Sequence, residues 1–206
     1  RLFWDLSGPY CRTRGKNRYH GLLVDQATSR DWSFFKPEKV DFADDLEEHF
    51  QKYKAKGFPC KYLRLDNAGE WEYLCPICAK MGITMEFTAP HTPQLNAKVE
   101  REFPTIRNMA YATLMGSGMS DSKQMVHWAY ALKDVTLLQN LQPRNDYPNA
   151  FSPFGDRVPI KSRDLVPFEA HGWMKIPGKI RAKWTPKAVE VIRVGYAEDQ
   201  PSDTYV

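Results

Sequence analysis

The sequence has few cysteines and no long apolar run, and both absences narrow the classes of protein that it can belong to. Only 4 of the 206 residues are cysteine, too few and too scattered for a disulfide scaffold, so we expect a reducing compartment. No stretch approaches the roughly 18 apolar residues of a membrane span. The first residues, RLFWDLSG, lack the regions of a signal peptide. We therefore expect an intracellular protein that does not cross a membrane, and a piece of a longer polypeptide, because the chain starts at Arg1.

The composition is that of a folded protein with an uneven distribution of charge. Hydrophobic residues make up 42% of the chain and charged residues 26%, which excludes a disordered chain. The net charge is only +4, but residues 156–187 hold eight basic and three acidic side chains. Such a basic block between near-neutral and acidic parts indicates a polyanion as the partner.

The spacing of apolar residues predicts elements in the order βββαβαβα, which is an α/β protein with a mixed sheet. The predicted strands are Leu2–Leu6, Tyr19–Val24, Trp32–Phe35, Cys60–Asp66 and Ile83–Ala89. A helix follows the third strand, with Pro37 in its first turn. A shorter helix follows the fourth, and Pro76 should break or restart it. Its inward side chains should be Trp71, Leu74, Cys75 and Cys78.

Two longer helices and a small β module complete the prediction. The first helix runs from about Ala97 to Met115, with Asn96 as its N-cap. The second spans roughly Ser122–Leu141 and has the apolar face Met125, Trp128, Leu132, Val135 and Leu138. Short strand-like segments then follow a loop rich in proline, asparagine and glycine. We predict a catalytic core over residues 1–145, a linker over 146–165 and a truncated β module over 166–206.

Three acidic residues occupy unusual positions. Asp5 lies inside the first strand, Asp66 ends the fourth, and Glu100 lies near the start of the helix after the fifth. Burying a carboxylate without compensation is costly, but several carboxylates can share divalent cations. In a βββαβαβα sheet the first and fourth strands can be parallel neighbours, so Asp5 and Asp66 would project near one edge and Glu100 would lean over it. Read singly, Asp66 could cap a turn and Glu100 could pair with Arg101 in solvent.

Together, the three carboxylates predict a site for phosphoryl transfer. They can hold two hard cations about 3.5–4 Å apart, an arrangement that activates an attacking hydroxyl or water and stabilises the leaving oxygen. Mg²⁺ prefers oxygen ligands and keeps several waters, so a pocket with few protein ligands suits it.

The segments around these acids resemble a known family. They are DLSGPY around Asp5, YLRLDNAGEW around Asp66 and FTAPHTPQLNAKVER around Glu100. In these segments the chain resembles the integrase region of copia-type long-terminal-repeat retrotransposon polyproteins, and more broadly the catalytic core of retroviral integrases. The segments NAFSPFGDRVP, PFEAHGWMKIPG and AVEVIRVGY are similar to the SH3-like module that follows the core in copia polyproteins.

The resemblance implies an RNase H-like fold with a DDE site made of Asp5, Asp66 and Glu100, each a catalytic residue and a metal ligand. It implies a polynucleotidyl transferase that joins cDNA 3′ ends to target DNA, with two Mg²⁺ or Mn²⁺ ions and without an organic cofactor or zinc. It also implies a homo-oligomer that acts in the nucleus after a stage in cytoplasmic virus-like particles.

The resemblance further implies contacts to DNA. Pro93, Gln94 and Asn96 match the loop beside the active site, and Lys98, Arg101 and Arg107 would face a DNA end from the helix of Glu100. For these three cations a solvated helix face is an equally good interpretation. The basic residues that could bind phosphates in the last segment are Lys175, Lys179, Arg181, Lys183 and Lys187.

Three features depart from the family pattern. Ala97 stands where a glycine is usual, and Pro104 lies four residues after Glu100, where a proline removes the backbone hydrogen bond to the Glu100 carbonyl. Either the helix kinks there or this is a decayed copy of the element. The third departure is that the family's zinc-binding HHCC module is absent from this chain. Cys75 and Cys78 have the spacing of metal ligands but no second pair, so we predict that both are buried. An RNase H-like nuclease and an inactive DNA-binding remnant remain the alternative functions.

Overall fold

The computed structural model describes residues 1–66, 71–88, 97–144, 146–176, 186–196 and 204–205. The chain divides into two compact units. We call Arg1–Arg157 the core unit and Val158–Val206 the C-terminal unit. The division falls within the segment 146–165 that the sequence predicts to be a linker, and the predicted domain bounds stay a prediction.

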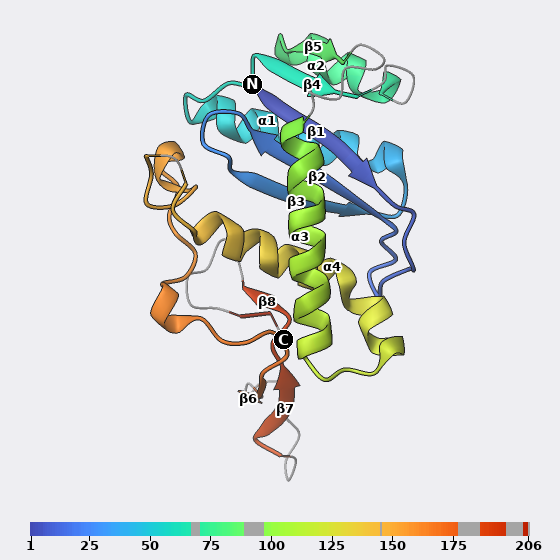
Figure 1. The fold of residues 1–206 in the computed structure, drawn as a ribbon, viewed down its shortest axis with the longest axis vertical. Helices are drawn as coiled ribbons and strands as arrows, with labels where there is room; N and C mark the ends of the chain where they lie inside the picture. The colour runs from blue at the N-terminus through green and yellow to red at the C-terminus, as the bar shows by residue number, and fades with distance from the viewer. Residues whose placement is uncertain (67–70, 89–96, 145, 177–185, 197–203, 206) are drawn as a thin grey trace. The chain divides into compact units, whose positions relative to one another are not determined.

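A mixed five-stranded sheet forms the centre of the core unit (Figure 1). Its strand order is β3-β2-β1-β4-β5, in which β1, β2 and β3 are antiparallel and β4 is parallel to both β1 and β5. The strands are β1 Leu2–Ser7, β2 Tyr19–Asp25, β3 Asp31–Lys36, β4 Tyr62–Leu65 and β5 Thr84–Phe87. The predicted sheet and the parallel pairing of the first and fourth strands are confirmed.

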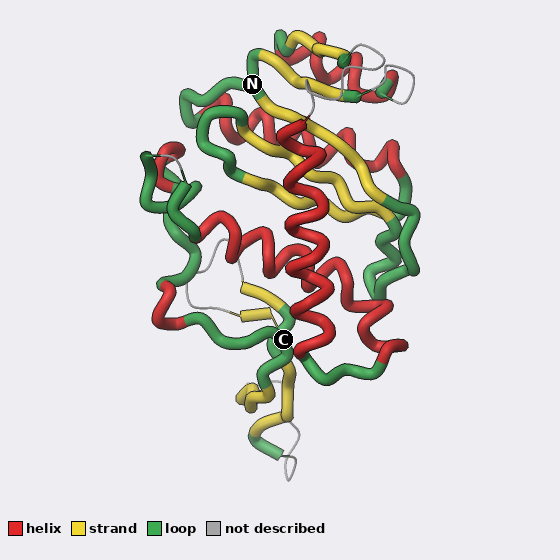
Figure 2. The backbone as a smooth tube through the Cα atoms, viewed as in Figure 1, coloured by secondary structure: helices red, strands yellow, loops and turns green. Residues whose placement is uncertain are grey.

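Helices cover both faces of this sheet. The α-helices of the core unit are α1 Phe42–Ala55, α2 Cys75–Met81, α3 Ala97–Gly116 and α4 Asp121–Leu141. Short 3₁₀ turns are η1 Lys39–Asp41, η3 Glu72–Leu74 and η5 Ser152–Phe154. In Figure 2, α3 crosses one face of the sheet, while α1 lies behind it. The largest apolar cluster lies on the α1 side and joins β1, β2 and β4 to α1 and α2.

Alternation along β1 determines which side chains enter that cluster. Leu2 and Trp4 point into it, so Phe3 and Asp5 project from the opposite face, where α3 contacts β1 and β2. Trp4 is fully buried, and its ring fits because it lies over Gly21, two residues along β2 from its register partner Leu23. A Cβ at residue 21 would lie 2.1 Å from the Trp4 ring. The strand that carries Asp5 is therefore held in place by its own tryptophan.

Two details of the predicted helices, at Pro37 and Cys75, are wrong, and one, at Pro76, is confirmed. Pro37 precedes η1 and is not in a helical turn. Pro76 restarts the helix, since η3 ends at Leu74 and Pro76 lies in the first turn of α2. Cys75 is exposed while Cys78 is buried, because the 3₁₀ turn η3 precedes α2 and residues 71–78 do not form one continuous α-helical face.

Helices α3 and α4 each add a feature that the sequence did not settle. Helix α3 continues through Pro104 as one element, so the proline does not end it. In α4, Met125 is 54% exposed, although the sequence predicts it on the apolar face. The buried face of α4 includes polar residues instead, among them Asp134, Thr136 and Asn140. Asn140 exchanges hydrogen bonds with the backbone of Asp31, which explains its burial.

The C-terminal unit contains two short antiparallel pairs. Strand β6 His171–Lys175 pairs with β7 Ala188–Ile192, and β8 Gly195–Tyr196 pairs with β9 Thr204–Tyr205. Tyr196 anchors this unit because its hydroxyl accepts a hydrogen bond from the Val166 backbone N–H at 2.6 Å. The SH3-like character of the unit stays a prediction. In the described part of the chain, no helix has the length and apolar character needed to span a bilayer.

Candidate active site

A pocket at the ends of β1 and β4 brings two of the three predicted acids together. Its lining consists of Asp5, Leu6, Ser7, Gly8, Tyr19, Lys39, Asp66 and Trp71. Sixty residues lie between Asp5 and Asp66 in the sequence, yet both line this pocket. Two neighbouring parallel strands of the sheet therefore supply the two carboxylates.

Strand register explains the meeting of these acids. Strands β1 and β4 pair in parallel with Leu2 opposite Leu63 and Phe3 opposite Arg64. The same offset, continued two residues, brings Asp5 level with Asp66. Neighbouring strands lie about 4.7–4.9 Å apart, so two side chains at equivalent positions of the two strands share one local environment.

Each aspartate is oriented by a hydrogen bond from a nearby group. The indole Nε1–H of Trp71 donates to the backbone carbonyl of Asp66 at 2.9 Å and to its Oδ1 at 3.1 Å. Trp71 is only 1% exposed, so its ring is a fixed support. Asp5 Oδ1 accepts a hydrogen bond from the backbone N–H of Leu6 at 2.7 Å.

Lys39 is a pocket residue that sequence reasoning missed. It lies in η1, just before α1, and its side chain lines the pocket with both aspartates. A cation beside two carboxylates offsets part of their mutual repulsion, and it can also attract a phosphate. Nothing in the local sequence distinguishes Lys39 from a solvated lysine at a helix start.

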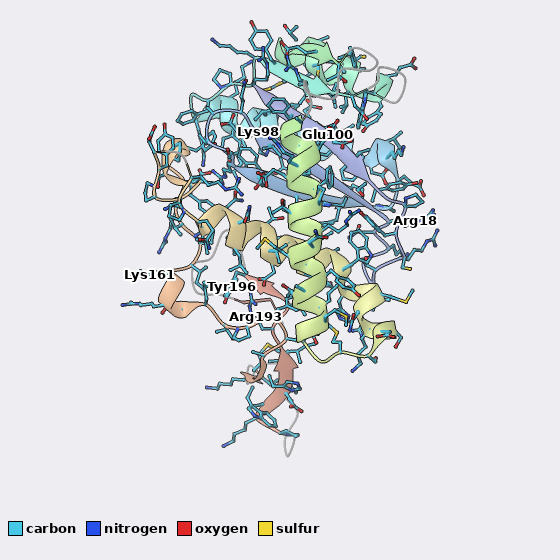
Figure 3. The ribbon with its side chains drawn as sticks, viewed as in Figure 1. Arg18, Lys98, Glu100, Lys161, Arg193 and Tyr196 are labelled. Carbon is cyan, nitrogen blue, oxygen red and sulfur yellow. The ribbon has the colours of Figure 1, made fainter. Side chains whose placement is uncertain are left out.

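Glu100 does not line this pocket. It lies in the first turn of α3 and is exposed, on a helix that contacts β1 and β2 (Figure 3). Among the residues that the structure describes, no three His, Cys, Asp or Glu side chains are grouped closely enough to hold a metal ion. The structure thus gathers Asp5 and Asp66 and leaves Glu100 apart from them.

A polar network anchors the start of α3 to the β2–β3 turn and to the end of α4. Lys98 Nζ donates to the Gln26 carbonyl at 2.6 Å, and Arg144 forms ion pairs with Asp31 at 3.1 Å and with Glu102 at 3.5 Å. Burial raises the pKa of Asp31 to about 7, although Arg144 acts in the opposite direction. Burial also lowers the pKa of Lys98. This network determines the position from which Glu100 projects.

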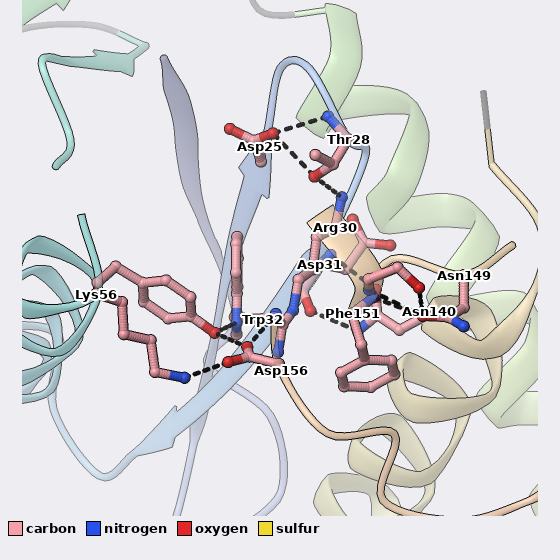
Figure 4. Close-up of polar contacts among 12 residues, drawn as sticks. Asp25, Thr28, Arg30, Asp31, Trp32, Lys56, Asn140, Asn149, Phe151 and Asp156 are labelled. Atoms are coloured by element: carbon pink, nitrogen blue, oxygen red, sulfur yellow. Dashed lines mark hydrogen bonds and ion pairs between the residues drawn. The ribbon is translucent and has the colours of Figure 1, made fainter. Parts of the chain in front are cut away.

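A second network attaches the segment after α4 to the core unit (Figure 4). The Asp156 carboxylate pairs with Arg30 and Lys56 and accepts a hydrogen bond from the Tyr53 hydroxyl at 2.8 Å. The Arg30 guanidinium also lies 4.6 Å from the centre of the Phe151 ring. Residues around 150 are therefore part of the core unit.

The remaining predicted site residues have varied positions. Arg101 and Arg107 are exposed on α3, and Arg101 Nε also donates to the Ala97 carbonyl at 3.0 Å. Lys175 and Lys187 are exposed in the C-terminal unit. The following predicted residues lie outside the described part of the chain: Pro93, Gln94, Asn96, Lys179, Arg181 and Lys183. All of these DNA contacts, including that of Lys98, stay predictions.

One curated protein provides a comparison over almost the whole chain. The chain is 28% identical over 215 residues to the "Retrovirus-related Pol polyprotein from transposon TNT 1-94" of Nicotiana tabacum. The match covers 97% of this chain but 15% of that polyprotein. No protein-family model matches the chain.

Solved structures show the same fold. The catalytic core domain of BIV integrase is 17% identical with a TM-score of 0.52, and the match covers 74% of this chain and 91% of that one. A chain of the simian T-cell lymphotropic virus intasome, solved with the PP2A regulatory subunit B56 gamma, is 13% identical with a TM-score of 0.53. That match covers 96% of this chain and 69% of the other. The predicted RNase H-like fold and the resemblance to an integrase core of a retrotransposon polyprotein are confirmed.

Proposed function

We propose that this chain is the catalytic core of a metal-dependent integrase that joins 3′ ends of element DNA to target DNA. The observation that carries the proposal is the pocket in which Asp5 and Asp66 meet at the ends of two parallel central strands. The similarity to a retrovirus-related Pol polyprotein and to integrase cores supports DNA integration as the setting of this chemistry.

The donor set of the pocket fits Mg²⁺ or Mn²⁺. Asp5 and Asp66 offer carboxylate oxygens, which these hard cations prefer, and the described residues that line the pocket include no cysteine or histidine. Bound divalent ions would lower the pKa of an attacking hydroxyl and stabilise the leaving oxygen. Trp71 would hold Asp66 in the orientation that ligation requires.

Glu100 is the third proposed ligand. Its place in the first turn of α3, on the sheet face from which Asp5 projects, supports this role. Because Glu100 lies outside the pocket, it would join Asp5 and Asp66 in holding a metal ion only if the start of α3 shifted towards them. Lys39 would neutralise part of the charge of the two aspartates before ligation and contact a phosphate oxygen afterwards.

The test is a strand-transfer assay with a short duplex that mimics a cDNA end, in Mg²⁺ and in Mn²⁺. Asp66→Asn and Glu100→Gln should each abolish strand transfer while near-UV circular dichroism and thermal unfolding stay unchanged. The exposed Lys54→Gln serves as the control and should retain activity. Activity retained by Asp66→Asn would overturn the assignment of the site.

An inactive DNA-binding remnant is the second candidate, and the position of Glu100 outside the pocket favours it. A remnant would bind DNA but would show no saturable Mn²⁺ binding that depends on Asp5 and Asp66. An RNase H-like nuclease is separated from both by cleavage of an RNA–DNA hybrid. The first proposal, the integrase, also includes that the protein acts as a homo-oligomer and that it acts in the nucleus.

A further inference from the structure

The loop between β1 and β2 concentrates positive charge beside the pocket. Residues 6–24 include Arg12, Arg14, Lys16 and Arg18 and contain no aspartate or glutamate. We call the segment 7–19 that carries these four residues the cationic loop. Arg12, Arg14 and Lys16 are exposed, and within the described part of the chain no ion pair joins any of the four to a carboxylate. Their charge is available to a partner.

The backbone of this loop is braced on both sides. Tyr10 N–H donates to the Arg18 carbonyl at 2.7 Å, and Thr13 N–H donates to the Asn17 carbonyl at 3.1 Å. On the helical side, Trp128 Nε1–H of α4 donates to the Cys11 carbonyl at 2.7 Å. The cations therefore project from a fixed frame, which lowers the entropy lost when they bind.

Lys16 stands at a turn with a left-handed backbone. Its φ is +65°, a left-handed conformation that glycine and asparagine adopt most readily. Gly15 and Asn17 flank it, so a residue better suited to this backbone stands on either side. Asparagine is therefore the substitution for Lys16 that suits this backbone.

The loop is continuous with the candidate active site. Ser7 and Gly8, which begin it, and Tyr19, which ends it, all line the pocket of Asp5 and Asp66. Gly8 permits this closure, since a Cβ there would lie 2.6 Å from the Arg18 carbonyl. Arg18, labelled in Figure 3, lies at the edge of the core unit next to Tyr19.

We propose that the cationic loop binds backbone phosphates of duplex DNA beside the pocket and so holds a phosphodiester at Asp5 and Asp66. This inference rests on the proposed function. Duplex DNA fits because it carries one phosphate per 3.4 Å of each strand, so several cations of one loop can meet successive phosphates. Such contacts position the DNA without reading its sequence.

The first test measures how DNA affinity depends on salt. A loop variant combines Arg12→Gln, Arg14→Gln, Lys16→Asn and Arg18→Gln; asparagine keeps the left-handed conformation at residue 16. A control variant removes the same charge at four exposed lysines elsewhere: Lys52→Gln, Lys54→Gln, Lys61→Gln and Lys123→Gln. Binding to a mixed-sequence duplex is followed by fluorescence anisotropy in EDTA, so that metal chemistry does not contribute.

The loop variant should bind at least about tenfold more weakly than the unmodified protein near 0.1 M salt. Its slope of log K against log salt should fall by about 0.9 for each phosphate that the loop no longer neutralises, while the control variant stays close to the unmodified protein. The inference is overturned if the loop variant keeps the original slope, or if the control variant loses as much affinity. It is also overturned if the loop matters for an RNA duplex and not for DNA.

The second test locates the DNA. Burial raises the pKa of Cys60 to about 12 and that of Cys78 to about 11, so the exposed Cys11 and Cys75 are the thiols to label. In a Cys75→Ser background, a photo-crosslinker on Cys11 should capture duplex DNA. In a Cys11→Ser, Cys75→Ser, Lys54→Cys protein, the same reagent near the far end of α1 should not. Equal capture from both positions contradicts the inference.

The two proposals can fail independently. Asp66→Asn should bind duplex DNA in EDTA as the unmodified protein does and lose strand transfer. Loop-dependent binding without any strand transfer by the unmodified protein would reject the proposed enzyme and keep the DNA-binding loop. Strand transfer that survives unchanged in the loop variant would reject the loop and keep the enzyme.

Discussion

Asp5 in β1 and Asp66, which directly follows the parallel strand β4, line one pocket, although 60 residues separate them in the sequence. The pairing of β1 with β4 brings the two aspartates together. After β1 the chain passes through β2, β3 and α1 and then returns to form β4 beside β1. The candidate site is thus a consequence of topology, and its stability depends on the packing of the central strands.

Trp71 should control the orientation of Asp66. Trp71→Phe removes the indole N–H that donates to the backbone carbonyl and to Oδ1 of Asp66, while most of the apolar packing is kept. We expect about 1 kcal/mol of lost stability and a tenfold or greater loss of Mn²⁺ affinity, measured by calorimetric titration. As a control, Trp173→Phe changes a tryptophan that is 75% exposed, and it should leave Mn²⁺ affinity unchanged. An unchanged affinity in Trp71→Phe would show that this hydrogen bond has no part in the site.

Gly21 should be intolerant of any side chain. In Gly21→Ala the added methyl group meets the Trp4 ring, so we expect a loss of about 1–3 kcal/mol in the free energy of unfolding, measured with urea. Gly116→Ala is the matched control, since a Cβ there meets nothing within 4 Å. Equal stability of the two variants would mean that β1 and β2 adjust freely around Trp4.

Acid should destabilise the core unit through two buried histidines. Burial lowers the pKa of His20 and of His49 to about 3, whereas the unfolded chain protonates histidine near 6.5. Between these values the unfolded state binds more protons, so the free energy of unfolding should fall as pH falls from about 6.5 towards 3. The raised pKa of Asp31, about 7, has the opposite effect: between about pH 7 and 4 the folded state binds more protons at this residue, which raises the free energy of unfolding as pH falls.

The His49→Phe variant isolates this effect, because His49 packs among aromatic rings that can accept phenylalanine. Its free energy of unfolding should depend less on pH than that of the unmodified protein over the same range. Urea unfolding at several pH values gives the difference directly. A variant that keeps the full pH dependence would contradict the neutral state assigned to His49.

Asp156 should be essential for the attachment of its segment to the core unit. Its side chain is 10% exposed and pairs with Arg30, which is 7% exposed, so Asp156→Ala leaves a buried guanidinium without its carboxylate. We expect the free energy of unfolding of Asp156→Ala to fall by about 3–5 kcal/mol. The exposed Asp164→Ala should cost little, since its side chain is 53% exposed. Thermal and urea unfolding of both variants provide the test.

Local patterns in the sequence are sufficient to predict the sheet but not the details of the helices. Short apolar segments predict the strands β1 to β5, and turn residues between the first three mark where those strands end. The prediction for Cys75 is wrong because η3 shifts the helical phase before α2 begins. The buried polar face of α4 escapes prediction because its partner, Asp31, is more than one hundred residues away in the sequence.

The site is predictable to the extent that it depends on strand order. Asp5 and Asp66 follow from the expected parallel neighbours, whereas the position of Glu100 outside the pocket depends on how Lys98 and Glu102 anchor the start of α3. From the sequence, the cationic loop is only a set of turn residues between two strands. The structure adds that the residues at the two ends of this loop line the pocket, which places its positive charge beside Asp5 and Asp66.

Asp5 and Asp66 should jointly bind the divalent ions used in phosphoryl transfer, and the proposed integrase activity depends on this. Anomalous diffraction from crystals of the protein soaked in Mn²⁺ tests it most directly. We expect Mn²⁺ coordinated by carboxylate oxygens of both Asp5 and Asp66, and its loss in Asp66→Asn crystals. Crystals that hold Mn²⁺ elsewhere and show none between these two aspartates would contradict it.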